Sequence, residues 1–96
     1  MRVCALVTDL MDRSRLSAAI PGVGFSLDHA AEVVIVDLAR DGAARVAELR
    51  AAMPAARIVC YGPHVDDEAA AAAQAAGADI VMPRSRFFRD PAAAIA

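Results

Sequence analysis

Residues 33–37 form an unbroken apolar run that ends on an acid, Val33-Val34-Ile35-Val36-Asp37. Such a run suits a strand that is covered on both faces, as in a parallel sheet. In an open parallel sheet, the ligand crevice lies at the carboxyl ends of the strands. We therefore expect Asp37 to point into the functional site of this protein.

Segments typical of strands and of helices alternate along the chain. We expect strands at residues 3–7, 23–27, 33–36, 58–61 and 80–82. We expect helices at residues 12–20, with Asp12 as the N-cap, at 41–53 and at 66–76, and a short terminal helix near residue 90 after a loop over residues 84–89. This alternation predicts an α/β fold with a doubly wound parallel sheet and right-handed crossovers.

The link between the second and third expected strands is short. Only Asp28 to Glu32 separates Leu27 from Val33, whereas a parallel crossover normally takes about ten residues or more. The helix between these strands is therefore expected to be shortened or missing. Its loss would uncover part of one sheet face, and exposed apolar surface of this kind often marks an interaction site.

Composition bounds the size and the surroundings of the fold. The 96 residues suffice for one small domain, expected to span residues 1–96. Aromatic residues make up only 4% of the chain, so the core is thin, and association, here as a homodimer, would stabilise it. The net charge of -2 provides no field for nucleic acid or an anionic membrane. Because no signal peptide is apparent and no apolar run could span a bilayer, the expected location is cytoplasmic.

The strand ends between Glu32 and Arg84 carry charged residues in an order that resembles response-regulator receiver domains, and the likeness extends over nearly the whole chain. Asp37 matches the aspartate that closes the third strand and accepts a phosphoryl group in that family. The resemblance implies a reduced flavodoxin-like fold with the strand order 2-1-3-4-5. It also implies a role in two-component signal transduction.

The chain departs from the receiver pattern at several strand ends. Thr8-Asp9 matches a pair of acids that holds Mg²⁺, so only Asp9 and Asp37 remain for a weak magnesium site. Gly62 matches a serine or threonine that bonds the phosphoryl group, and Arg84 matches a lysine. Phosphoryl transfer depends on positioning and charge stabilisation. We therefore expect a degenerate pseudo-receiver that is not phosphorylated and has no other cofactor.

The crevice at the strand ends is expected to contain Thr8, Gly62, His64 and Arg84 beside Asp37. With no lysine to compete, we expect Asp37 and Arg84 to form a direct ion pair.

Both cysteines, Cys4 and Cys60, lie in expected strands and are interpreted as buried core residues. One strand would separate theirs, at a distance of roughly 10 Å, which is too far for a disulfide. We expect two free thiols.

Arginine and phenylalanine gather in the segment from Arg84 to Arg89. Such residues are favoured at interface cores, which predicts a protein interface made by Arg84, Arg86, Phe87, Phe88 and Arg89. In the other interpretation, one phenylalanine closes the core while the arginines are solvated. The negative net charge disfavours binding of nucleic acid.

These patterns together predict a stand-alone receiver-like signalling or protein-interaction module with an unknown protein partner, and not an enzyme. One alternative is a working phosphoacceptor that uses Asp37 and Asp9 with Mg²⁺. The other is a small enzyme or ligand-binding protein whose crevice presents Asp37, His64 and Arg84.

Overall fold

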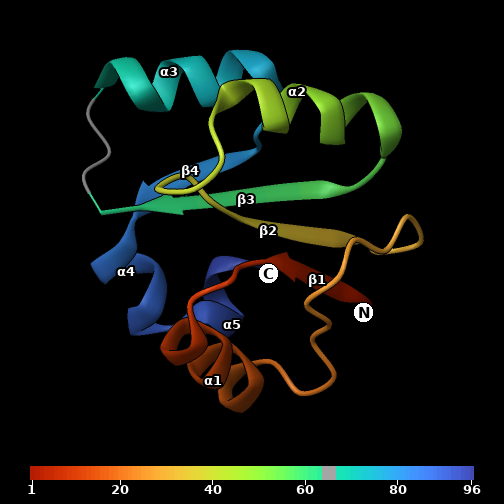
Figure 1. The fold of residues 1–96 in the computed structure, drawn as a ribbon, viewed down its shortest axis with the longest axis vertical. Coiled ribbons are helices and arrows are strands. Elements are labelled where there is room, and N and C mark those ends of the chain that lie inside the picture. The colour runs from red at the N-terminus through yellow and green to blue at the C-terminus, as the bar shows by residue number, and fades with distance from the viewer. Residues whose placement is uncertain (64–66) are drawn as a thin grey trace.

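The computed structural model describes residues 1–63 and 67–96 and arranges them in three layers (Figure 1). The middle layer is one parallel sheet with the strand order β1-β2-β3-β4, made of β1 (Val3–Leu6), β2 (Val33–Asp37), β3 (Arg57–Gly62) and β4 (Ile80–Pro83). One face carries α2 (Ala43–Ala52) and α3 (Asp67–Ala76), and the other carries α1 (Leu10–Ala19), α4 (Arg84–Arg89) and α5 (Pro91–Ala94).

The apolar run of β2 is buried on both faces, as its sequence predicts. Val34 and Val36 pack into the core beneath α2 and α3. Val33 and Ile35 pack into the other core, with α1, α4 and α5. This division follows from the strand geometry, in which successive side chains point to opposite faces of the sheet.

The predicted strand order 2-1-3-4-5 is wrong, because residues 23–27 do not form a strand. Only Gly24 pairs with β1, through an isolated parallel bridge to Cys4. The Ala5 N–H donates to the Gly24 carbonyl at 2.8 Å, and the Gly24 N–H donates to the Val3 carbonyl at 3.0 Å. Each further parallel pair would carry the chain about 3.3 Å away from the amino end of the sheet. The chain must return to that end, because β2 starts there with Val33 beside Val3. The short link therefore leaves no room for a longer ladder between residues 23–27 and β1.

No helix lies between residues 20 and 32, in agreement with the short crossover. The loop replaces part of the missing cover, since Ala31 is buried in the same core as Cys4 and Val34. Leu6 and Leu38 at the other end of this face remain only partly buried. Leu27 is among the exposed large hydrophobic residues.

Helix α1 starts two residues earlier than predicted, and α2 starts two residues later, at Ala43 after its cap Gly42. The segment predicted as a loop forms α4. Helix α1 begins at Leu10, because the Asp9 carboxylate caps it and accepts the Asp12 N–H at 2.9 Å. Asp12 is therefore inside the first turn of the helix and not its cap. The short helix α5 is confirmed, with Asp90 as its cap. Among the described residues, no helix has the length and apolar character needed to cross a membrane.

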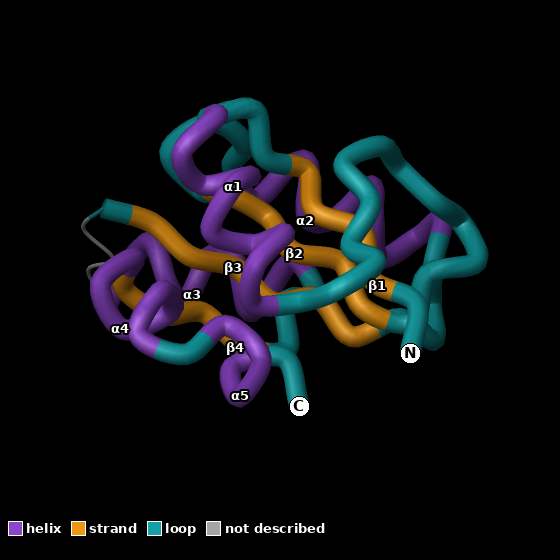
Figure 2. Tube along the Cα trace, turned by 90° about the horizontal axis from the view of Figure 1, so that it is seen from below, coloured by secondary structure: helices purple, strands orange, loops and turns teal. Residues whose placement is uncertain are grey.

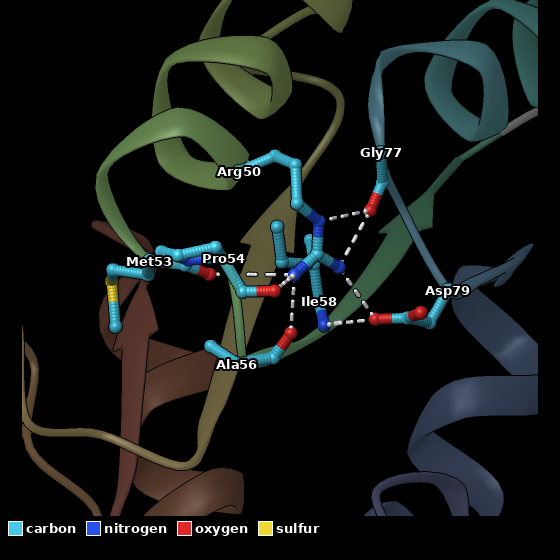
Figure 3. A network of polar contacts seen from close by, with 7 residues as sticks. All are labelled: Arg50, Met53, Pro54, Ala56, Ile58, Gly77 and Asp79. Atoms are coloured by element: carbon cyan, nitrogen blue, oxygen red, sulfur yellow. Dashed lines mark hydrogen bonds and ion pairs between the residues drawn. The ribbon is translucent and has the colours of Figure 1, made fainter.

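A polar network centred on Arg50 joins α2, α3 and the amino ends of β3 and β4 (Figure 3). Its guanidinium donates to the carbonyls of Met53, Pro54, Ala56 and Gly77 and to the Asp79 carboxylate. Since the Asp79 carboxylate also accepts the Ile58 N–H at 2.8 Å, the network binds two loops to the start of the sheet.

Both chain termini lie near the amino end of the sheet (Figure 2). Met1 and Ala96 line the same hollow there, together with Val33 and Arg57. The carboxyl end of the sheet, where function is expected, is at the opposite edge.

Candidate functional site

The parallel strands bring the sequence-predicted site residues to one edge of the sheet. Thr8 and Asp9 follow β1, and Asp37 ends β2. Gly62 ends β3, and Arg84 follows β4 directly. His64 lies outside the described residues. The strand order separates Asp37 from Arg84 by β3, whose Tyr61 is in register with Asp37.

A residue that the sequence analysis did not assign to the site, Asp12, lies at the centre of it. The Arg84 guanidinium binds the Asp12 carboxylate in a bidentate manner, with Nη1 donating to Oδ2 and Nη2 to Oδ1. The Tyr61 hydroxyl donates a third bond to Asp12 Oδ2 at 3.0 Å. Asp12 has 0% of its surface exposed. The Asp12–Arg84–Tyr61 triad therefore satisfies a buried charge with three hydrogen bonds.

The triad alters the protonation of its members. The hydrogen bonds from Arg84 lower the pKa of the Asp12 carboxyl, against the opposing effect of burial. Hydrogen bonding to Asp12 raises the pKa of Arg84. Burial raises the pKa of Tyr61, and the carboxylates of Asp37 and Asp12 raise it further. At neutral pH the triad is thus an anion, a cation and a neutral phenol.

The predicted ion pair between Asp37 and Arg84 is wrong. Among the described residues, Arg84 forms its ion pair with Asp12, and no ion pair joins Arg84 to Asp37. The reason is that α1 starts early, at Leu10. Asp12 therefore lies in the first turn of this helix, where its side chain reaches Arg84 at the end of β4. The fork of the Arg84 guanidinium, with one N–H from each terminal nitrogen, is directed at Asp12 and not at Asp37.

Asp37 is engaged by its own turn. Its Oδ1 accepts the Ala39 N–H at 2.9 Å. Its main-chain carbonyl accepts the N–H groups of Arg40 and Asp41 at 3.1 and 3.0 Å. An aspartate that bonds the main chain two residues on is typical of a turn. The carboxylate is nevertheless partly exposed at the edge of the sheet.

The described residues at this edge offer few oxygen ligands for the weak magnesium site expected at Asp9 and Asp37, and that site stays a prediction. Asp9 uses one carboxylate oxygen to cap α1, and Asp37 uses one in its turn. Asp12, the third acid nearby, is held by Arg84 and Tyr61. No group of three or more His, Cys, Asp or Glu side chains that could hold a metal ion occurs in residues 1–63 and 67–96. Magnesium requires several hard oxygen ligands in near-octahedral geometry.

Comparison with known proteins shows the likeness in structure and not in sequence. No protein-family model matches the sequence, and no curated protein matches it. A response regulator of Burkholderia pseudomallei, solved with a phosphorylated aspartic acid, a calcium ion and citrate, superposes with a TM-score of 0.77 at 19% identity, covering 100% of this chain and 67% of that one. The fold is that of a receiver domain.

Two further structures show the same fold at similar distance. An orphan response regulator of H. pylori has a TM-score of 0.71 at 16% identity, covering 88% of this chain and 82% of that one. A CheY-like protein of Pseudomonas aeruginosa has a TM-score of 0.69 at 19% identity, covering 88% of this chain and 87% of that one. The resemblance of the sequence to receivers thus correctly predicted the fold class.

Within this receiver fold, α4 divides the predicted interface residues between the core and the surface. Phe87 is fully buried and stacks on Tyr61 with ring centroids 4.7 Å apart. Phe88 meets both rings edge-on at 5.0 Å and stays partly exposed. Arg86 and Arg89 are exposed, whereas Arg84 is held in the triad. The interpretation that one phenylalanine closes the core is therefore confirmed for Phe87, and the predicted interface stays a prediction.

One sequence signal could have placed Asp12 in the site. Asp12 and Leu16 are four residues apart, so that in a helix they share a face, and Leu16 is the buried anchor of α1. The expectation that Asp12 caps the helix concealed this relation, because a cap lies outside the helical face.

Proposed function

We propose that this chain is a receiver-like signalling module that acts through contact with a protein partner and is not phosphorylated at Asp37. The response regulators that share its fold support a role in signalling. The proposed role is cytoplasmic and does not include enzymatic activity.

The observation that carries the proposal is the placement of Arg84 on Asp12. Arg84 is the cation that follows β4, at the position matched to the receiver lysine, and it is bound by both carboxylate oxygens of Asp12. Phosphoryl transfer needs cations positioned to stabilise the transferred group. A bidentate Arg84–Asp12 pair withdraws that cation from Asp37. Gly62 supplies no hydroxyl, and Thr8 replaces one acid.

Treatment with acetyl phosphate and Mg²⁺ tests the proposal. Intact-mass spectrometry should find no phosphoryl adduct on the native chain, as on the Asp37→Asn variant. A response regulator known to accept phosphate, treated in parallel, confirms that the reagent is active. A stoichiometric adduct that disappears in Asp37→Asn would show that the chain is a working phosphoacceptor.

A second variant tests the stated reason. Thr8→Asp combined with Asp12→Asn restores the missing acid and removes the negative partner of Arg84. We expect this double variant to bind beryllofluoride with Mg²⁺ more tightly than the native chain, measured by changes in backbone amide resonances near Asp37. Circular dichroism verifies that the variant is folded. An unchanged response would mean that the Arg84–Asp12 pair is not what prevents phosphorylation.

A further inference from the structure

A hollow of about 550 Å³ lies between α1 and α4, which are side by side beneath the sheet (Figure 1). Its lining comprises Arg15, Pro63, Arg84, Ser85, Phe88 and Arg89. Its volume is in the range of pockets that bind small molecules or single protein side chains. The hollow shares Arg84 with the Asp12–Arg84–Tyr61 triad, and Asp37 is not among its lining residues.

Two cations of this hollow have no anionic partner among the described residues. Arg15 lies over the Phe88 ring at 5.7 Å, and its guanidinium makes no ion pair there. Arg89 is exposed and likewise makes no ion pair with a described residue. Arg84, by contrast, is neutralised by Asp12. Two cations without an ion pair among the described residues therefore line the hollow beside Phe88, and Arg15 also acts on the buried Asp12 carboxylate through space.

The acids nearest in sequence do not compensate these cations. Asp90, which follows Arg89, uses its carboxylate to cap α5 by accepting the Ala93 N–H at 3.2 Å. Asp12, three residues before Arg15, is bound by Arg84 and Tyr61, and Asp9 caps α1. None of these three acids lines the hollow.

An exposed methionine extends the apolar part of this surface. Met11 is 67% exposed and lies four residues before Arg15, so the two share a face of α1. Methionine, phenylalanine and arginine are enriched at protein interfaces. Methionine in particular adapts to irregular partner surfaces. The surface thus combines two apolar side chains, Met11 and Phe88, with the cations Arg15 and Arg89.

We propose that this α1–α4 surface, formed by Met11, Arg15, Ser85, Phe88 and Arg89, binds an acidic amphipathic segment of a protein partner. Carboxylates of the partner pair with Arg15 and Arg89, and an apolar side chain lies over Phe88 and Met11. The inference rests on the proposed function, because it names the chemistry of the partner through which the module acts.

Charge favours this occupant over two others. In a two-fold dimer through the same surface, Arg15 and Arg89 would face copies of themselves, and like charges at an interface are unfavourable. Nucleic acid needs a broader positive field, and the chain carries a net charge of -2.

Fluorescence anisotropy with a labelled 12-residue peptide tests the inference. The probe carries two leucines at helical spacing flanked by glutamates, and a matched probe carries lysines in their place. A labelled single-stranded thymidine oligonucleotide serves as the nucleic-acid probe. The variants are Arg15→Glu/Arg89→Glu, Met11→Ala, and the control Arg40→Glu/Arg45→Glu, which makes the same change in net charge outside this surface. All of these side chains are at least partly exposed, and circular dichroism verifies folding.

We expect the glutamate probe to bind and the lysine probe not to bind, with an affinity that falls as salt is added. Arg15→Glu/Arg89→Glu should weaken binding about tenfold or more, and Met11→Ala about threefold. The control should stay within about twofold of the native chain. Equal binding of both peptides, or an unaffected Arg15→Glu/Arg89→Glu variant, would overturn the inference.

Two other results would assign the surface to a different occupant and also overturn the inference. One is oligonucleotide binding that Arg15→Glu/Arg89→Glu abolishes. The other is a native dimer, seen by sedimentation, that this variant dissociates and the control does not.

Repeating the peptide titration after acetyl phosphate treatment separates this inference from the proposed function. If Asp37 is phosphorylated and the peptide still binds, only the proposal of a non-phosphorylated module fails.

Discussion

Asp12 is fully buried, and Arg84 and Tyr61 supply the hydrogen bonds that a buried carboxylate needs. The carboxylate in turn holds α1 against the start of α4, 72 residues further along the chain. Arg84 keeps 37% of its side chain exposed, so water screens part of the interaction. At the scale of single residues, the contribution of this triad to stability can be measured by replacing Asp12.

Replacement of Asp12 by asparagine should destabilise the protein by about 2–3 kcal/mol at neutral pH, because it removes a charged partner from Arg84. The pKa of Asp12 in the folded protein is below its ordinary value of 3.8. Its stabilising contribution is therefore complete above that value and is lost as the pH falls through the lowered pKa. Urea unfolding from neutral to acidic pH should show the difference between native and Asp12→Asn chains shrinking below pH 3.8. A difference that does not vary with pH would contradict this account.

The two cysteines should be chemically inert in the folded protein. Cys4 and Cys60 are free and buried, and β2 lies between their strands, as expected. Burial raises the pKa of Cys60 to about 12, and burial also raises the pKa of Cys4. Since the thiolate is the reactive form, a thiol reagent at pH near 8 should modify neither residue until urea is added. Rapid modification of the folded protein, or fewer than two thiols after unfolding without reductant, would disprove this.

At the scale of elements, the connections between helices and strands depend on particular backbone conformations. Gly77, after α3, has a φ of +121°, and a Cβ there would lie 2.7 Å from the Cγ of Arg50. Arg50 itself binds the Gly77 carbonyl. The α3–β4 connection and the Arg50 network are therefore built around the absence of a side chain at residue 77.

Three glycine-to-alanine variants should separate backbone strain from steric conflict. Gly77→Ala combines both and should destabilise by about 3 kcal/mol or more. Gly22→Ala has a φ of +86° but nothing within 4 Å, so only strain remains, about 1 kcal/mol. Gly42→Ala has neither problem and should stay within about 1 kcal/mol. Thermal unfolding of the three variants gives the order, and an equal loss at Gly77 and Gly22 would mean that Arg50 moves aside freely.

At the scale of the whole molecule, both outer strands of the sheet are open to association. Strand β4 pairs only with β3 among the described strands, and Ile80, Val81 and Met82 are partly exposed. On the other side, the outer edge of β1 pairs with one bridge residue, Gly24, within residues 1–63 and 67–96. Such open edges are templates for pairing with another chain.

We expect a homodimer that forms along a sheet edge, because pairing there satisfies main-chain groups and removes apolar area from water at about 25 cal/mol per Å². Sedimentation equilibrium over a range of concentrations measures the mass. The Arg15→Glu/Arg89→Glu variant should have the same mass as the native chain, since those residues are on the α1–α4 surface. A monomeric mass up to high micromolar concentrations would contradict the prediction.

Local sequence patterns were sufficient for most of the elements. The run from Val33 to Val36 specifies a doubly covered strand, and the next residue, Asp37, lies at its carboxyl end, because both properties depend only on neighbours in the chain. The short link before Val33 likewise excluded a full crossover helix from length alone. The alternation of strands and helices and the match to receivers then indicated the fold class that the structural comparisons support.

The partners of the charged residues and the order of the sheet were decided by long-range contacts. Residues 23–27 looked like a strand, but the return path to Val33 allowed one bridge. Arg84 was expected to pair with Asp37, but it pairs with Asp12. The helix α1 starts at Leu10, three residues earlier than it would with Asp12 as its cap, so Asp12 lies inside the helix and reaches Arg84. Side chains distant in sequence meet according to helix starts, strand order and burial, and these emerge only when all elements pack together.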